Sequence, residues 1–554
     1  MSDLAKTTWR DQLIGALLAT SYVAWLVKTA RNLGFARDEG FYFSAVNEYA
    51  RWFTLLAERP ASALKQPAID NVWAANHEHP AFIKSLFAIS KMLFFDKFHV
   101  FSDMSTAFRF PGMVMSGIAL WITYLFGARV FSRQAGLIAS LLLALMPTVF
   151  YHAHLACFDM PIVCMWIGTL YAYYRSAESP SFARSILLGI VYGLTLNTKH
   201  NAWILPLVIV PHALLIRFRD ARYSFSRGLL PIPMNVVAML TVGPLVFYAT
   251  WPWIWNDTGV RLQQYVAFHV NHEYYNMEFL GHNYFSAPSP RAYMPVMIAA
   301  TVPTATLLLF VTGAIDRLRT AFKRVLSALP WKAPARPDPL HVDLLLAVAF
   351  CAAIGPWLLP KTPIFGGSKH WMTAYPVLCL FAGRGFDIVT STVTKSLRVT
   401  ESKRRVLLQV ALAASVLLAP AIVTAHSHPF GLSSYVPFVG GVRGGATIGL
   451  NRQFWGYTTQ NANTEYLEKN APPNASVFIH DTAWDAWGRM SDEKRVRPDL
   501  RAVGSPSDAQ FSLVQHELHM AEVDYQAWVA YGTAAPVYVV TQDEVPIVSI
   551  YRAR

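Results

Sequence analysis

Six long stretches of this 554-residue chain contain no charged residue, and each is long enough to cross a membrane as a helix. They are Phe110–Ala128, Ala135–Tyr151, Leu229–Trp255, Ala292–Ile315, Leu344–Pro360 and Val406–Ala425. Weaker candidates are Leu13–Val27, Met160–Tyr174, Ser185–Thr198, Asn201–Ile216 and Trp371–Gly383. The chain is 54% hydrophobic and only 15% charged, which argues against a soluble enzyme. The pattern predicts a polytopic α-helical membrane protein with about eleven transmembrane helices.

The first apolar segment, Leu13–Val27, is not followed by a small-residue cleavage site. We therefore expect it to remain as a membrane anchor and not to be removed as a signal peptide. All four cysteines lie in or beside apolar segments, where packing is the expected role.

Basic residues fall in alternate loops between the apolar segments. These groups are Arg129 and Arg133; Arg175 and Arg184; Arg217, Arg219, Arg222 and Arg227; Arg317, Arg319, Lys323, Arg324, Lys332 and Arg336; and Lys395, Arg398, Lys403, Arg404 and Arg405. Cytoplasmic loops carry such an excess, so we expect the N-terminus in the cytoplasm and, after eleven spans, the C-terminus outside a cell (inner or plasma) membrane. This accounts for the net charge of +13 without a nucleic-acid partner.

The chain divides into a membrane part, residues 1–425, and a tail, 426–554, without apolar spans. Two long exterior loops, 31–108 and 253–291, interrupt the membrane part. Pro80–Phe98 and Phe41–Glu58 have the helical spacing of amphipathic helices lying on the membrane surface. The tail has strand-like runs at 476–480 and 536–541 and a helical stretch near 461–469, which predicts a small exterior α/β domain with a parallel strand pair.

Two adjacent acids, Asp38 and Glu39, are the first candidate catalytic residues in the first exterior loop. Acids at a helix start also complement the helix dipole, and an isolated pair would favour that interpretation. Here, however, further ionisable residues follow on the same predicted side: His77, Glu78 and His79, then Arg109, His152, His154 and Asp159. The second exterior loop adds His269, Tyr274 and His282 among other aromatic and polar residues, a density that suits a sugar or lipid headgroup. An interfacial belt of Trp and Tyr is the alternative for part of this loop.

These motifs and their order resemble glycosyltransferase family 39, the protein O-mannosyltransferase and aminoarabinose-transferase group of the membrane-embedded C-type superfamily. The resemblance is carried by the Asp-Glu pair, His79-Pro-Ala-Phe-Ile-Lys84, Arg109-Phe-Pro111, Asp159 before Pro161, and Trp251-Pro-Trp-Ile-Trp255. Ala81 stands where the family has a second proline. The resemblance covers roughly residues 10–390. It implies an inverting transferase that moves a sugar from a polyprenyl-phosphate donor at the outer membrane face.

Such a reaction needs a general base and cations for the leaving phosphate. We expect Asp38 to be the base and Glu39 to orient the acceptor or a cation. Lys361, Lys369 and His370 lie in one loop whose glycines let the backbone approach a phosphate. Lys199, which could equally snorkel, and Arg109 are further phosphate-binding candidates.

The remaining predicted substrate-binding residues are Glu78, His79, His154, Asp159, His269, Tyr274 and His282. Asp38, His77 and His79 could together ligate a divalent ion (Mg, Mn or Zn), although no cofactor is required. The alternative to metal binding in this segment is that Glu78 pairs with another side chain. Expected partners are the lipid-linked donor, the bilayer, and a protein, glycolipid or polysaccharide acceptor.

Two other classes compete with a transferase. A polytopic transporter or flippase of a lipid-linked substrate would place ionisable residues near mid-membrane, whereas these spans are nearly free of charge. A non-catalytic scaffold would leave the Asp-Glu pair and the histidine-rich loops unexplained.

Overall fold

The structure is a computed structural model that describes residues 7–220, 232–327, 341–364, 366–454 and 456–553. Some residues of the predicted features therefore fall outside the described part of the chain: Arg222, Arg227, Lys332, Arg336, Phe365 of the predicted phosphate-binding loop, and the first three residues of the predicted span Leu229–Trp255.

The chain is mostly helical, and its helices follow the apolar stretches, because a helix satisfies its own backbone hydrogen bonds where water is absent. The helical bundle comprises α1 (Trp9–Thr29), α6 (Met104–Val130), α7 (Arg133–Ala144), α8 (Pro147–Ala153), α9 (Asp159–Glu178), α10 (Phe182–Leu196), α11 (Leu205–Asp220), α12 (Met234–Ala249), α14 (Tyr293–Thr301), α15 (Thr304–Ser327), α16 (Val342–Ile354), α17 (Tyr375–Ser396) and α18 (Ser402–Ser427).

Among the described residues, four helices are long and apolar enough to cross a membrane, or up to six if each bent helix pair counts as one span. Four further apolar helices are shorter. The count of eleven crossings therefore stays a prediction.

Two spans predicted as continuous are bent at prolines. The predicted span Ala135–Tyr151 bends by 71° between α7 and α8, and Ala292–Ile315 bends by 115° between α14 and α15. Met146 and Val302, which precede Pro147 and Pro303, have extended backbones. Proline lacks an amide hydrogen and disfavours the helical conformation of the residue before it, which accounts for the break at these two positions.

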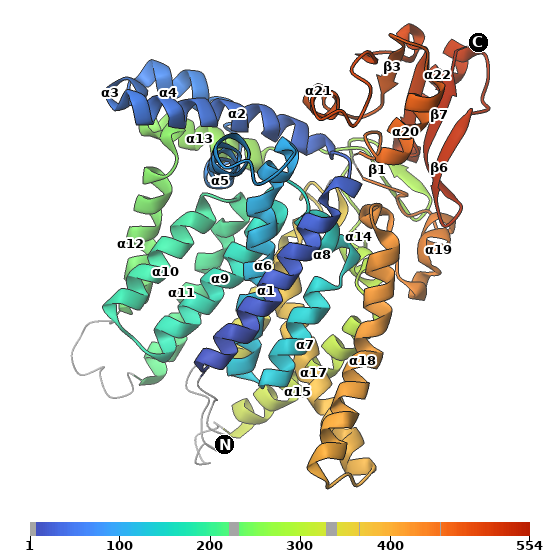
Figure 1. Ribbon diagram of the computed structural model, residues 1–554. Coiled ribbons are helices and arrows are strands. Elements are labelled where there is room, and N and C mark those ends of the chain that lie inside the picture. Colours follow the sequence, from blue (N-terminus) through green and yellow to red (C-terminus); the bar gives the residue numbers. More distant parts are fainter. Residues whose placement is uncertain (1–6, 221–231, 328–340, 365, 455, 554) are drawn as a thin grey trace.

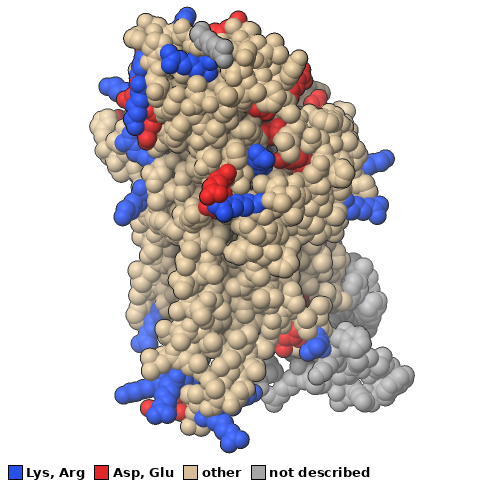
Figure 2. All heavy atoms as spheres, turned by 90° about the vertical axis from the view of Figure 1, so that its right-hand side faces the viewer, with Lys and Arg blue, Asp and Glu red and all other residues tan. Residues whose placement is uncertain are grey.

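The long connections gather at one end of the bundle (Figure 1). There lie α2 (Arg37–Glu58), α3 (Pro60–Ala63), α4 (Gln66–Trp73), α5 (Phe82–Ser90), the π-helical turn η2 (Lys91–Lys97) and α13 (Thr258–Val270), with the hairpin β1 (Met277–Phe279) and β2 (His282–Tyr284). Short 3₁₀ turns η3 (His200–Ile204), η6 (Pro252–Trp255), η7 (Gly355–Leu358), η8 (Gly367–His370) and η9 (Met372–Ala374) join them. Figure 2 shows a middle band nearly free of charge and a group of lysines and arginines at the opposite end.

The C-terminal residues form a small α/β unit beside this end (Figure 1). Its sheet has the order β4-β3-β5-β7-β6, from β3 (Ser476–Ile479), β4 (Arg501–Val503), β5 (Phe511–Gln515), β6 (Tyr538–Gln542) and β7 (Val545–Arg552). β3 pairs in parallel with β4 and β5, and the other pairs are antiparallel. The helices are α19 (Gly441–Thr447), α20 (Asn461–Asn470), α21 (Trp484–Asp492) and α22 (Ala521–Tyr531).

The C-terminal unit is fastened to the start of α2. Phe35 N–H donates to Thr459 Oγ1 (2.7 Å) and Gly34 N–H to the Gln460 side chain (2.9 Å). A Cβ atom at Gly40 would lie 2.6 Å from Cβ of Ala483, so only glycine allows α2 to pack this closely against α21. The C-terminal unit therefore fixes the helix that carries Asp38.

Candidate active site

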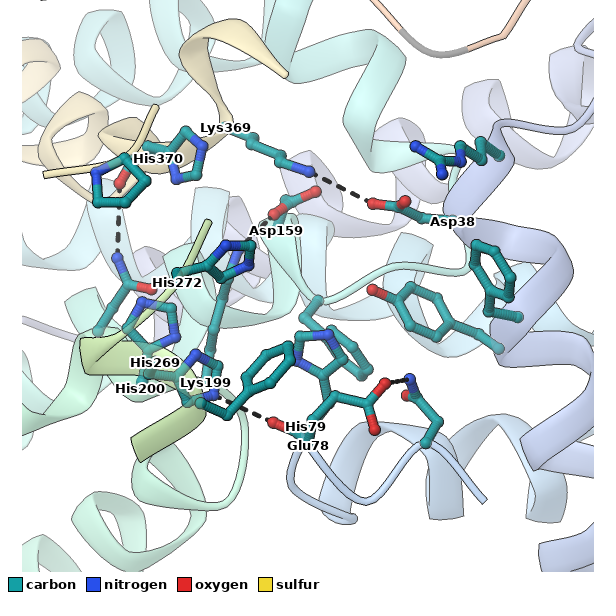
Figure 3. Close-up of a pocket in the computed structure, with 18 of the residues that line it drawn as sticks. Asp38, Glu78, His79, Asp159, Lys199, His200, His269, His272, Lys369 and His370 are labelled. Carbon is teal, nitrogen blue, oxygen red and sulfur yellow. Dashed lines mark hydrogen bonds and ion pairs between the residues drawn. The ribbon is translucent and has the colours of Figure 1, made fainter. Parts of the chain in front are cut away.

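A cavity of about 670 Å³ opens where the long loops meet the end of the bundle. Its walls come from α2, the turn before α5, the first residues of α9, η3, α13, the loop around η8, and α21 (Figure 3). The cavity brings together the predicted site residues Asp38, Glu78, His79, Asp159, Lys199, His269, Lys369 and His370. Residues from six separate parts of the chain thus share one pocket.

Asp38 is the second residue of α2, and its side chain is 29% exposed to the cavity. The Lys369 ammonium lies 3.3 Å from Asp38 Oδ2, and Lys369 itself is buried on η8. Figure 3 shows this ammonium between Asp38 and Asp159. The Asp38 carboxylate therefore faces the cavity and has the Lys369 ammonium as a neighbouring cation.

Asp159 and Lys199 form a second, more buried ion pair. Lys199 Nζ donates to Asp159 Oδ1 over 2.8 Å, and His152 Nδ1 lies 3.4 Å from Oδ2 of the same carboxylate. Asp159 begins α9, where a negative charge is favourable to the helix dipole. The predicted alternative for Lys199, snorkelling to the interface, does not describe this position, because its amine points into the pocket and binds Asp159.

Three histidines form one wall. The rings of His200 and His269 lie 4.1 Å apart between centroids, and His79 lies 5.9 Å from His269. Burial holds the pKa of His79 and of His200 well below the usual range and lowers the pKa of His269 to about 4. All three imidazoles are therefore neutral near pH 7, and a neutral imidazole offers one donor and one acceptor.

The turn that carries Glu78 and His79 is held from beneath by Lys84. Its buried ammonium donates to the backbone carbonyls of Asn76 (2.5 Å) and His79 (3.0 Å) and to the Asn76 side chain (3.2 Å). Burial lowers the pKa of Lys84 to about 7. Glu78 accepts from Asn76 Nδ2 (2.6 Å), in line with the pairing role expected as the alternative for this residue.

Glu39 and Arg109 lie outside the cavity and bind each other. Arg109 Nε and Nη2 each donate over 2.8 Å to the Glu39 carboxylate, with both side chains at most 1% exposed. Glu39 also accepts from the amides of Ala36 (3.0 Å) and Ala156 (2.9 Å). All of its oxygens are occupied, so we correct the roles expected for Glu39 in orienting substrate and for Arg109 in binding phosphate.

Four predicted substrate- or phosphate-binding residues, His154, Tyr274, Lys361 and His282, also do not line the cavity. His154 is buried against Thr29 (2.8 Å) and the Phe150 carbonyl (2.7 Å). Lys361 is exposed, and its carbonyl accepts from the Tyr274 hydroxyl (3.3 Å). His282 is exposed on the β-hairpin. The described cavity therefore does not support their predicted roles in binding the substrate or its phosphate.

The expected metal group does not assemble in the part of the chain that the structure describes, where no cluster of three or more His, Cys, Asp or Glu side chains could hold a metal ion. His77 turns away from Asp38 and packs on Trp253, with ring centroids 4.6 Å apart. Asp38 and His79 remain in the cavity without it.

Sequence reasoning missed much of the cavity wall. His370, which it predicted, stacks on Trp357, with ring centroids 4.6 Å apart. Neither Trp357 nor Asp485 on α21 carried a sequence signal, because each reaches the pocket only through tertiary packing. Trp203 stands four residues after Lys199, and that proximity was the one available hint.

The predicted resemblance to glycosyltransferase family 39 is confirmed for part of the chain. Residues 92–248 match the family model described as dolichyl-phosphate-mannose-protein mannosyltransferase. A comparison with curated proteins gives no match.

Among solved structures, archaeal oligosaccharyltransferase AglB from Archaeoglobus fulgidus, in complex with an inhibitory peptide and a dolichol-phosphate, is similar at 12% identity and a TM-score of 0.49, over 95% of this chain and 71% of that chain. ArnT from Cupriavidus metallidurans bound to undecaprenyl phosphate is similar at 14% identity and a TM-score of 0.42, over 96% of this chain and 97% of that chain. Both are distant likenesses.

Glu39→Ala should destabilise the protein by about 3–5 kcal/mol, because it leaves the Arg109 guanidinium buried without its partner. Thermal unfolding of the purified variant in detergent measures this loss. Glu48→Ala on the same helix is the matched control: its partner Arg51 is 74% exposed, so removing that pair should cost less than about 1 kcal/mol. A Glu39→Ala protein with wild-type stability but altered substrate affinity would show that Glu39 acts in substrate binding and not in stability.

Proposed function

We propose that this protein is a membrane glycosyltransferase that moves a sugar from a polyprenyl-phosphate donor to an acceptor hydroxyl, with inversion, at the outer face of the membrane. The observation that carries the proposal is the Asp38 carboxylate facing a cavity whose two lysines, Lys199 and Lys369, can hold a phosphate. The match of residues 92–248 to a mannosyltransferase family supports the same class of donor.

The cavity suits both halves of such a substrate. Its volume of about 670 Å³ lies within the usual range for small-molecule sites. Aromatic side chains on its walls, Tyr42, Trp203, Phe268 and Tyr275, offer flat faces for a sugar ring. The neutral histidines add hydrogen-bonding edges without adding charge that would compete with the lysines for the phosphate.

In the proposed reaction Asp38 accepts the proton of the acceptor hydroxyl as the acceptor oxygen attacks the anomeric carbon. The bond from that carbon to the donor phosphate oxygen breaks, and the phosphate leaves with the electron pair, stabilised by Lys369 and Lys199. Attack and departure on opposite faces of the sugar invert the anomeric configuration. Asp159 keeps Lys199 in place through its 2.8 Å bond.

Elements that line the cavity, among them α2 and α13, lie at the end of the bundle opposite the group of basic residues (Figures 1 and 2). Because basic residues are retained on the cytoplasmic side, we propose that the cavity and the C-terminal unit face outward.

The sidedness can be tested with fusions at the C-terminus. An alkaline phosphatase fusion, which is active only after export, should be active, and a green fluorescent protein fusion exported unfolded should be dark. The reverse pair of results would place the C-terminal unit in the cytoplasm.

Asp38→Asn should lower the turnover number by about two orders of magnitude or more, the usual effect of losing a general base, because an amide cannot take the proton. Transfer from a radiolabelled polyprenyl-phosphate sugar to envelope acceptors measures it. Glu48→Gln, on the same helix but outside the cavity, should retain wild-type turnover. Full activity of Asp38→Asn would remove Asp38 from the mechanism.

Lys369→Ala should raise the apparent KM for the donor more than the KM for the acceptor, because the missing charge acts on the phosphate. Lys361→Ala provides a matched control in the same loop, since Lys361 is exposed and lies outside the cavity, and should leave donor kinetics unchanged. Initial rates over a donor concentration series distinguish the two variants. Equal effects of both substitutions would assign the phosphate to the loop as a whole and not to Lys369.

A further inference from the structure

A second hollow lies on the flank of the helical bundle, away from the candidate active site. It is a groove of about 790 Å³ between α5 with η2, α6, α9 and α10. Figure 1 shows α6, α9 and α10 running side by side beneath α5. The groove and the cavity share no lining residue in the described chain.

Two hydrogen bonds join the turn before α5 to the residue that follows α10. Asn197 accepts from the Ala81 amide through its side chain (3.0 Å) and from the Phe82 amide through its carbonyl (3.2 Å). Asn197 is fully buried.

The walls of the groove are almost entirely apolar. They consist of side chains such as Leu86, Phe94, Phe110, Met165 and Leu187. Residues Phe110 to Ile122 of α6 follow its length, which at 1.5 Å per residue is about 18 Å. This is close to the depth of one bilayer leaflet, about 15 Å of hydrocarbon. The dimensions therefore suit acyl chains of one leaflet.

Charge is confined to one end of the groove, where Arg175 of α9 and Arg184 of α10 line it. Arg175 lies 3.2 Å from Glu178, which Arg129 also binds at 2.7 Å, so one carboxylate serves two arginines. Arg184 Nη1 donates to a neutral acceptor, the Ser179 carbonyl (2.6 Å). This end of the groove therefore carries an excess of positive charge.

An apolar groove of leaflet length with a cationic end matches an anionic glycerophospholipid. We propose that such a lipid binds here, with its phosphate at Arg175 and Arg184 and its acyl chains along α6, α9 and α10. The donor fits less well: if its phosphate lies near Lys369, in the cavity, it cannot also neutralise these arginines. A second copy of the chain could neutralise these arginines only by inserting an acidic side chain into this end of the groove.

The roof of the groove gives this lipid a structural consequence. α5 and η2 continue directly from the turn that places Glu78 and His79 in the cavity wall. A bound lipid fills the space beneath α5 and supports that turn from below. Occupancy should therefore stabilise the fold, whatever reaction the cavity performs.

The test is native mass spectrometry of the purified full chain after exchange into phosphatidylglycerol or phosphatidylcholine. We expect wild-type protein to retain phosphatidylglycerol preferentially and to melt at a higher temperature with it, since a ligand of the folded state stabilises that state. Arg175→Gln/Arg184→Gln should reduce retention about tenfold and abolish the gain in melting temperature. Arg398→Gln/Arg404→Gln, which removes two basic residues outside the groove, should behave as wild type.

A second variant fills the groove and leaves its charges in place. A Cβ at Gly168 would meet Ile122 at 3.6 Å and Val191 at 3.9 Å, ordinary contacts, so Gly168→Ala should be tolerated. Gly168→Phe should exclude the lipid with both arginines intact. Retention of phosphatidylglycerol by both the double-glutamine and the Gly168→Phe variants would overturn the proposal. Displacement of phosphatidylglycerol by an equal concentration of a polyprenyl phosphate would also overturn it. So would a lipid-free dimer of the wild-type chain that becomes monomeric in either variant.

Discussion

The buried ion pair between Glu39 and Arg109 is the interaction on which the candidate active site depends. Removing two charges from water is costly, and such a pair persists only when further hydrogen bonds satisfy the remaining atoms. Arg109 also donates to the carbonyls of Ala30 (3.1 Å) and Gly34 (2.6 Å), and Glu39 accepts the amide of Ala156. The end of α1, the start of α2, α6 and the turn before α9 are thereby held at one point. Asp38 directly precedes Glu39, and Asp159 follows Ala156 by three residues.

The C-terminal unit completes this arrangement from the other side. Arg37 lies 3.3 Å from Asp481, and α21 packs where Gly40 leaves room. Burial raises the pKa of Asp481, while the neighbouring Arg37 acts in the opposite direction. Arg37, Asp38 and Glu39 are consecutive, but their contacts differ. Arg37 pairs with the C-terminal unit and also lines the cavity, Asp38 faces the cavity, and Glu39 binds inside the bundle. All three residues lie in the first turn of α2.

The sequence was enough to predict the helical membrane class, the long loops and the common position of Asp38, Asp159, Lys199 and Lys369, since unbroken apolar runs and polar loops have few alternatives. It was not enough to separate Asp38 from its neighbour. Both are acids at a helix start, and only the packing of Arg109 shows that Glu39 is the one bound in a structural ion pair. The bends before Pro147 and Pro303 carried a local signal in the prolines themselves. Asp485 and Trp357 carried none, because they meet the cavity through contacts distant in sequence.

The contact between Asp38 and Lys369 has a consequence for the order of events. The charges of these two side chains balance each other, as do those of Asp159 and Lys199. Under the proposed function, an arriving phosphate competes with Asp38 for Lys369 and releases the carboxylate to accept the hydrogen of the acceptor hydroxyl. Asp38 would thus become available to the acceptor only after the donor is bound. An acceptor that arrives first would meet a carboxylate already occupied, a safeguard that needs no moving lid.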